Sequence, residues 1–147
     1  HPAVVEILGH GGWDWVSIDM EHATTDFAQV EHLVRAARLS DIVALVRVSD
    51  NQPILISKAL DAGAAGVIVP HVSSVDDLRA AVESTLYPPG GIRGACSTTG
   101  ATSYGALPWK EYVEAANKGV VVVPLIEDKA GVDNFDALPD KFLLLAE

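Results

Sequence analysis

Two residues with acid–base chemistry stand three positions apart at the end of an apolar run. Asp19 closes the run Trp13–Asp19, and His22 follows shortly after it. A histidine side chain moves protons readily near neutral pH, and a nearby carboxylate can orient the ring and raise its basicity. This spacing predicts an acid–base pair. The alternative interpretation is a set of ordinary polar residues at the entrance of a helix.

Arg47 closes a second apolar run, Val43–Val46. A guanidinium in that position is costly unless it meets an anion, and its planar fork suits a carboxylate held by two hydrogen bonds. One interpretation is therefore a substrate carboxylate bound by Arg47. The other is a structural ion pair with Asp19 or Asp50.

Glu127 follows the apolar run Val120–Ile126. A carboxylate oxygen there is a natural ligand for Mg²⁺ or Mn²⁺, which favour a few carboxylates together with water and substrate oxygens. A single carboxylate does not define a metal site, and an acidic residue at this point also suits the start of the next helix.

A stiff, glycine-rich segment, Tyr87–Gly94, could let the backbone approach a ligand closely, although a rigid surface loop is the commoner role of such a segment. His71, after Pro70, could be a ligand or proton carrier, and we favour a structural histidine. Three further residues have no chemical partner nearby in the sequence: His10, His32 and Cys96.

The elements that must position these side chains alternate between β-rich runs and helical patterns. We predict strands at 13–19, 42–48, 66–69 and 120–126, with another beginning at 142–145; helices at 26–39, 53–62, 76–86, 109–117 and 129–138; and a long loop at 87–105. Strands that are apolar on both faces, each followed by a helix, indicate a parallel sheet covered by helices.

Periodicity alone does not distinguish a barrel from an open doubly wound sheet. No glycine-rich dinucleotide motif or phosphate-binding loop follows any strand, which removes the main support for a nucleotide-binding open sheet. Asp19, Arg47, Pro70-His71 and Glu127 all fall at the carboxyl ends of strands, where a barrel has its active site. We therefore predict an α/β protein with a (β/α)8 TIM barrel. Because at most five strands are visible, residues 1–147 are interpreted as a single, partial barrel domain with N-terminal and C-terminal parts missing.

Composition excludes several classes of function. Twenty acidic residues against ten basic ones argue against nucleic-acid binding and against anionic membranes. No apolar run approaches the roughly 20 residues that span a bilayer. The single cysteine, Cys96, fits a reducing cytoplasm and leaves no internal disulfide framework. We expect a cytoplasmic enzyme that acts on small molecules.

Taken together, these segments resemble the HpcH/HpaI-type class II, metal-dependent pyruvate aldolases, which act on 2-keto-3-deoxy sugar acids and 4-hydroxy-2-oxoacids. The similarity runs through nearly the whole chain, and it rests on the order and spacing of several motifs: Gly12-Trp13-Asp14-Trp15, Ile18-Asp19-Met20-Glu21-His22-Ala23, Val46-Arg47-Val48, Asp61-Ala62-Gly63-Ala64, Val69-Pro70, Tyr87-Pro88-Pro89-Gly90-Gly91-Ile92-Arg93-Gly94, Ile126-Glu127 and Val132-Asp133-Asn134.

The resemblance implies a barrel of the phosphoenolpyruvate/pyruvate superfamily and a role for each matching residue. His22 would be the acid–base residue, with Asp19 orienting it. Arg47 would bind the pyruvate carboxylate and keto oxygen and stabilise the enolate. Glu127 would be one of two carboxylate ligands of Mg²⁺ or Mn²⁺, with Co²⁺ as a further option and the second ligand a few residues past Glu147.

The resemblance also implies contributions from three positions around this site. Pro70 and Gly94 would contact the substrate. Asp61 would lie at an interface or behind the site of a neighbouring subunit, because the family assembles through swapped helices into homo-oligomers, dimers or hexamers. The lysines fall in predicted helices or at their margins, which favours the metal mechanism over a Schiff base. The expected reaction is reversible aldol cleavage of a 2-oxo-4-hydroxy acid to pyruvate and an aldehyde.

Two positions depart from the family pattern. A family glutamine two positions before the metal-binding glutamate is Leu125 here, and an arginine often found within 97–104 is replaced by Gly100 or Ala101. The second stretch is similar to the decarboxylating branch typified by macrophomate synthase. Two alternatives therefore stay open: an oxaloacetate decarboxylase or condensing enzyme that uses the same enolate, and a non-catalytic barrel relative.

Overall fold

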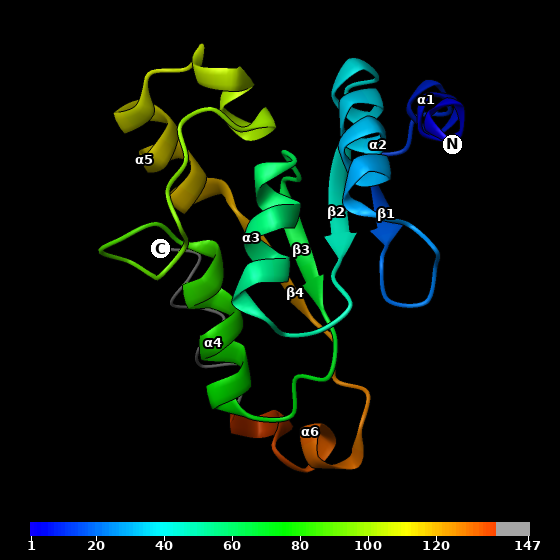
Figure 1. The fold of residues 1–147 in the computed structure, drawn as a ribbon. Helices are drawn as coiled ribbons and strands as arrows, with labels where there is room; N and C mark the ends of the chain where they lie inside the picture. Colours follow the sequence, from blue (N-terminus) through cyan, green and yellow to red (C-terminus); the bar gives the residue numbers. More distant parts are fainter. Residues whose placement is uncertain (138–147) are drawn as a thin grey trace.

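The computed structural model describes residues 1–137, and within them it contains one sheet of four parallel strands (Figure 1). The strands are β1 (Trp15–Asp19), β2 (Val43–Arg47), β3 (Gly66–Val69) and β4 (Val121–Pro124). They lie side by side in chain order. A doubly wound sheet reverses its strand order at a switch point, whereas a barrel adds each strand beside the one before it. The order in this chain is that of a barrel.

Helices alternate with the strands along the chain, and several of them cover one face of the sheet (Figure 1). They are α1 (Pro2–His10), α2 (Phe27–Leu39), α3 (Pro53–Asp61), α4 (Val75–Thr85), α5 (Trp109–Gly119) and α6 (Lys129–Asp133), with the short 3₁₀ turns η1 (Gly100–Gly105) and η2 (Phe135–Ala137). Figure 1 shows α2, α3 and α4 on the same side of the strands. Among residues 1–137, none of these helices has the length and apolar character that crossing a membrane requires.

Local sequence signals explain where the helices begin. Asp26 before α2, Ser74 before α4 and Asp128 before α6 each accept a hydrogen bond from the backbone N–H three residues later. These side chains satisfy amide groups that the first helical turn leaves without a partner. The start of α3 is set instead by Pro53, whose fixed φ suits the first helical position.

The structure differs from the sequence-based prediction in three places. The helix α1 was not predicted; its first turn begins with Pro2, and the His1 side chain accepts a hydrogen bond from the Ala3 N–H. The predicted loop 87–105 includes the turn η1. The predicted helix 129–138 ends at Asp133 and gives way to η2. The strand expected at 142–145 lies outside the described residues.

The two faces of the sheet have different surroundings. Side chains such as Ile18, Val46 and Val67 point toward the helices and are almost completely buried in the core. The opposite face is also apolar, yet Trp15 and Val43 at its edge are about half exposed, at 53% and 44%. It lines a hollow of about 400 Å³. Strands that are apolar on both faces are typical of a barrel, whose interior is filled by side chains from every strand.

Candidate active site

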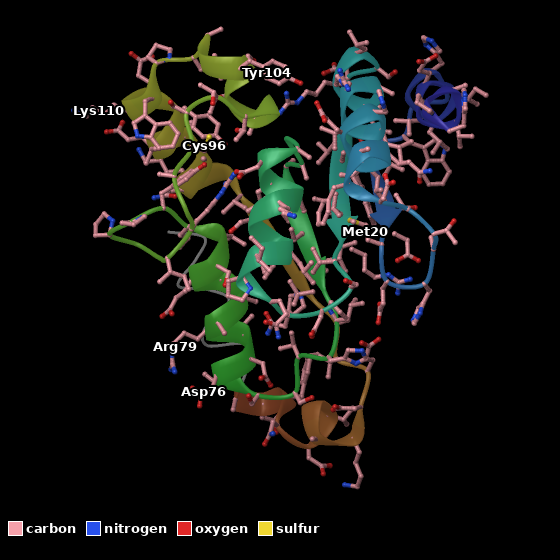
Figure 2. The ribbon with its side chains drawn as sticks, in the orientation of Figure 1. Met20, Asp76, Arg79, Cys96, Tyr104 and Lys110 are labelled. Atoms are coloured by element: carbon pink, nitrogen blue, oxygen red, sulfur yellow. The ribbon has the colours of Figure 1, made fainter. Side chains whose placement is uncertain are left out.

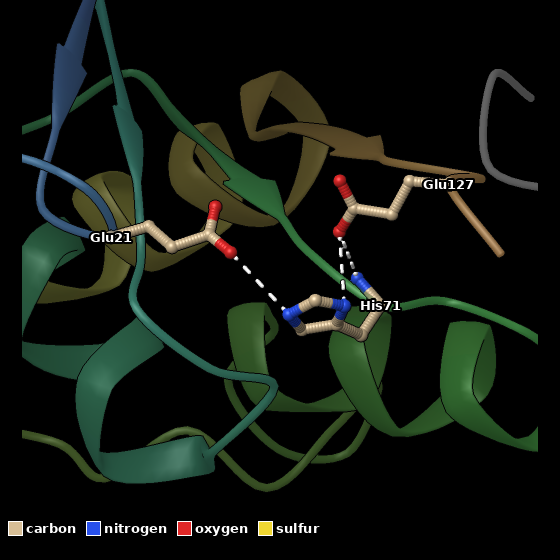
Figure 3. Close-up of side chains that lie close together, drawn as sticks. All are labelled: Glu21, His71 and Glu127. Atoms are coloured by element: carbon tan, nitrogen blue, oxygen red, sulfur yellow. Dashed lines mark hydrogen bonds and ion pairs between the residues drawn. The ribbon is translucent and has the colours of Figure 1, made fainter.

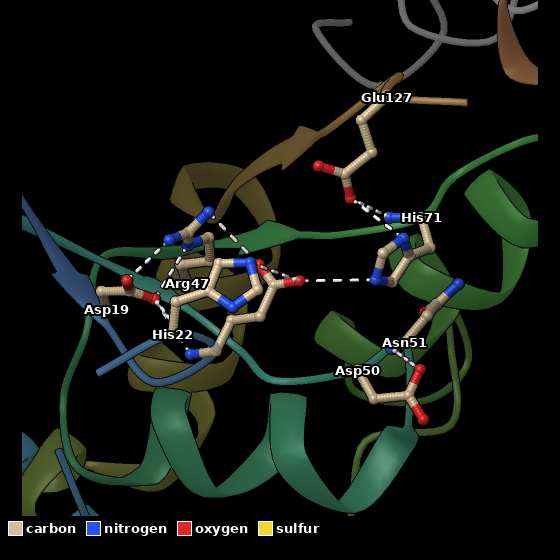
Figure 4. Close-up of polar contacts among 8 residues, drawn as sticks. Asp19, His22, Arg47, Asp50, Asn51, His71 and Glu127 are labelled. Carbon is tan, nitrogen blue, oxygen red and sulfur yellow. Dashed lines mark hydrogen bonds and ion pairs between the residues drawn. The ribbon is translucent and has the colours of Figure 1, made fainter. Parts of the chain in front are cut away.

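The parallel register brings the predicted polar residues to one edge of the sheet. Asp19 lies opposite Arg47 at the ends of β1 and β2. The ends of β3 and β4 lie in register as well, so the loops that follow them carry His71 and Glu127 to the same edge (Figure 4). Four of the predicted strand-end residues are thus neighbours in space, as a barrel active site requires.

Asp19 and Arg47 form a two-pronged ion pair at this edge. Arg47 Nε donates to Asp19 Oδ1 at 2.8 Å, and Nη2 donates to Oδ2 at 2.6 Å. These hydrogen bonds from Arg47 are the main cause of a pKa of Asp19 that is held well below its ordinary value. Of the two ion pairs predicted as alternatives, the one with Asp19 is present, while Asp50 accepts from the Asn51 backbone.

Asp19 contacts the backbone of His22 and not its ring, and the orienting role predicted for it stays a prediction. Its Oδ1 accepts hydrogen bonds from the backbone N–H groups of Glu21 at 2.9 Å and of His22 at 3.3 Å. The carboxylate therefore shapes the loop after β1 and holds Arg47. The carboxylate beside the His22 ring is Glu21, whose Oε1 lies 3.6 Å from Nε2. The imidazole itself is 74% exposed and faces the open side of the site.

Glu21 is a site residue that the sequence reasoning missed. Its side chain is only 7% exposed, and Oε2 lies 3.2 Å from Arg47 Nη1 without hydrogen-bond geometry. Its Oε1 lies 3.4 Å from Nε2 of His71. The sequence signal for Glu21 was its position as a third ionisable residue, between Asp19 and His22 in the loop after one strand. Burial of this carboxylate could not be deduced, because it depends on β2 and β3 packing around the loop.

His71, for which a structural role was favoured over that of a ligand or proton carrier, lies inside the site. Its side chain is 62% exposed and lies between two carboxylates (Figure 3). Glu127 Oε1 accepts a hydrogen bond from the His71 backbone N–H at 2.9 Å and lies 3.1 Å from Nδ1. The ring thus connects the loop after β3 with the loops after β1 and β4. Pro70, which precedes it, is buried at the end of β3.

These groups form a donor set that suits a hard divalent cation. One ligand atom each from Glu21, His71 and Glu127 lies within 4.8 Å of the others. Carboxylate oxygens with one imidazole match Mg²⁺ or Mn²⁺ chemistry. The buried Glu21 Oε2 without a hydrogen-bond partner leaves acceptor capacity at the site. The cluster also holds more carboxylates than guanidinium groups, an imbalance that a cation would relieve.

Asp61 and Gly94, two predicted positions, lie at the opposite end of the strands. Arg93 is buried, donates from Nη2 to Asp61 Oδ1 at 2.8 Å, and stacks over the Tyr87 ring with its guanidinium carbon 4.5 Å from the centroid. Asp61 ends α3, so this cluster lies near the amino ends of the strands. Gly94 follows Arg93 there, away from the strand-end cluster, and the substrate contact predicted for it stays a prediction. Cys96 of the same loop lies at this end too (Figure 2).

Sequence comparisons identify relatives over nearly the whole chain. The chain is 36% identical over 136 residues to a 2-dehydro-3,6-dideoxy-6-sulfogluconate aldolase from Pseudomonas putida, covering 92% of the chain and 52% of that protein. It is also 36% identical over 137 residues to a 5-keto-4-deoxy-D-glucarate aldolase from Salmonella paratyphi A, covering 93% and 53%. The chain thus spans about half the length of the curated relatives that it matches.

Structural comparisons lead to the same group of proteins. A HpcH/HpaI aldolase/citrate lyase family protein from Burkholderia cenocepacia superposes with a TM-score of 0.87 at 34% identity, over 94% of this chain and 55% of that one. The citrate synthase SbnG superposes with a TM-score of 0.81 at 33% identity, over 94% and 52%. This likeness confirms the predicted barrel-type α/β fold. The family model for HpcH/HpaI aldolase/citrate lyase matches residues 1–140, and the chain belongs to this family.

Proposed function

We propose that the protein of which this chain is part catalyses divalent-metal-dependent cleavage of a 2-oxo-4-hydroxy acid to pyruvate and an aldehyde. The observation that carries the proposal is the arrangement at one strand edge of an anchored guanidinium, an exposed imidazole and a carboxylate–imidazole cluster. Family membership and the aldolase relatives favour this reaction among those the arrangement could support.

Arg47 is suited to hold the carboxylate end of a 2-oxoacid. Its Nε and one Nη2 hydrogen are engaged by Asp19, which fixes the plane of the guanidinium. The side chain keeps 25% of its surface exposed, and a guanidinium has five N–H donors, so donors remain for a substrate carboxylate. A positive group held in this way also stabilises the negative charge that develops as an enolate forms.

Glu127 is the proposed metal ligand, and Glu21 and His71 surround the same space. A divalent cation bound there would polarise the 2-oxo group and take up negative charge during cleavage. The residue two positions before Glu127 is Leu125, which has no polar side chain to offer a cation. The candidate groups around this space therefore belong to the loops after β1, β3 and β4.

His22 is suited to carry the proton. Cleavage breaks the C3–C4 bond of the substrate: the C4 hydroxyl gives up its proton, the aldehyde leaves, and the electron pair passes into the enolate of pyruvate, which then takes a proton at C3. The exposed His22 ring can accept the hydroxyl proton directly or through one water. The neighbouring Glu21 carboxylate lies 3.6 Å from Nε2, within ion-pair distance of the ring.

The test is a pyruvate-release assay on the complete protein with a panel of 2-oxo-4-hydroxy acids and with oxaloacetate. We expect cleavage of at least one hydroxy acid with Mg²⁺ or Mn²⁺, and its loss with a chelator. His22→Ala should abolish cleavage while pyruvate still binds, and His32→Ala on α2 should behave as the wild type. Turnover of oxaloacetate, with none of the hydroxy acids cleaved, would contradict the aldolase proposal.

A second candidate reaction is decarboxylation of oxaloacetate, or condensation onto the same enolate. The likeness to a citrate synthase at 33% identity favours it. The same substrate panel separates the two candidates, because only the aldolase releases an aldehyde. If no substrate reacted and neither Mg²⁺ nor Mn²⁺ raised the melting temperature, a non-catalytic role would replace both.

A further inference from the structure

His71 holds a backbone conformation that its residue type disfavours. Its φ is +57°, in the left-handed region where a β-carbon is strained. Strain of this kind costs on the order of 1 kcal/mol and persists where surrounding contacts determine the conformation. In this conformation both the backbone N–H and the ring of His71 contact Glu127.

Both contacts from His71 to Glu127 fall on one oxygen. The backbone N–H lies 2.9 Å and Nδ1 lies 3.1 Å from Oε1. Among residues 1–137, no hydrogen bond or ion pair reaches Oε2 of Glu127, which leaves this oxygen available on a side chain that is 36% exposed. A carboxylate held by one oxygen with the other available has the arrangement of a metal ligand that is oriented by a neighbouring residue.

The other ring nitrogen is engaged as well. Nε2 of His71 lies 3.4 Å from Oε1 of the buried Glu21. With one carboxylate at each nitrogen, the ring has no lone pair directed at open space. In this geometry the His71 ring bridges Glu127 and Glu21.

We propose that His71 is a positioning residue, which fixes the Glu127 carboxylate for a divalent cation and ties it to the loop after β1. The inference rests on the cation site of the proposed function and adds a residue that acts through Glu127. Residues that orient metal ligands in this way typically contribute about 10- to 100-fold to metal affinity.

The test uses two substitutions in the complete protein, with Mn²⁺ as the probe. His71→Gly removes the ring but adopts a positive φ without strain, so the metal-free melting temperature should not fall. His71→Asn tolerates the same φ and keeps a side-chain amide donor that can reach Glu127. His10→Ala, at the exposed end of α1, is the matched control.

We expect the Mn²⁺ dissociation constant, measured by electron paramagnetic resonance titration, to rise about tenfold or more in His71→Gly. It should stay near the wild-type value in His71→Asn and in the control. The inference would be overturned if His71→Gly bound Mn²⁺ as tightly as the wild type. It would also be overturned if the weaker binding of His71→Gly came with a lower metal-free melting temperature. A nitrogen coupling in the wild-type Mn²⁺ spin-echo spectrum that disappears in His71→Gly would make His71 a direct ligand and also overturn it. Failure of the wild type to bind Mn²⁺ would overturn the cation site itself.

Discussion

Replacing Asp19 with asparagine tests how the substrate-binding arginine is held. Asp19→Asn keeps an oxygen at Oδ1, which accepts from Arg47 Nε and from the Glu21 N–H. It replaces Oδ2 with an amide that faces Arg47 Nη2, a donor 2.6 Å from that oxygen in the wild type. One charge-assisted hydrogen bond is lost and two donors oppose each other. The free energy of unfolding at pH 7 should therefore fall by about 2 kcal/mol.

The pH dependence of this loss follows from the depressed pKa of Asp19. The hydrogen bonds from Arg47 hold that pKa well below the ordinary value of 3.8. A carboxylate with a depressed pKa in the folded state contributes stability above its unfolded-state pKa, and this stability is lost as the pH falls through the folded-state pKa. The difference between wild type and Asp19→Asn should be constant from about pH 8 to pH 5 and should shrink below about pH 4.

Urea denaturation followed by tryptophan fluorescence across this pH range measures the difference. Asp14→Asn is the matched control, because Asp14 is exposed just before β1 and its carboxylate makes no hydrogen bond within residues 1–137. We expect the control to change stability by less than about 0.5 kcal/mol. Equal losses in both variants, or a difference that stays unchanged down to about pH 2, would refute the reasoning from the Asp19–Arg47 pair.

Three further predictions address binding, metal and core. Arg47→Ala should abolish detectable pyruvate binding in calorimetry because it removes the anchored guanidinium, and binding at wild-type affinity would contradict its role. Glu127→Gln should weaken Mn²⁺ binding by at least about tenfold, since a neutral amide replaces a carboxylate ligand, and an unchanged titration would exclude Glu127 from the site. Ile56→Ala should lower the free energy of unfolding by about 2–5 kcal/mol, because Ile56 is fully buried in α3; a loss below about 1 kcal/mol in urea denaturation would show that the core is packed differently.

Much of the fold follows from local signals in the chain. The β-rich runs predicted all four described strands, because strands buried on both faces carry apolar residues at most positions. Pro53, Asp26 and Ser74 marked helix starts through effects confined to a few neighbouring residues. The first helix, α1, was missed although Pro2 lies at its start, since a short helix at the beginning of the sequence has few residues to reveal a period.

The family and the strand-end residues Asp19, Arg47 and Glu127 could be predicted from the sequence, because residue type and order along the chain carry that information. For Arg47 the sequence left two partners open, Asp19 and Asp50. The parallel register, which sets Asp19 opposite Arg47, decided between them.

The same limit applies to the two ends of the sheet. The resemblance to the family predicted a substrate contact for Gly94. Because α4 runs back along the sheet, Gly94 lies with Arg93 near the amino ends of the strands. The position of His71 between Glu21 and Glu127 and its positive φ could not be deduced from the sequence, because both depend on how three loops pack together. The sequence by itself determined the alternation of strands and helices, the family and the chemical types at the strand ends. Only the tertiary structure decided which charges meet, because contacts between loops depend on strand order, register and packing rather than on spacing along the chain.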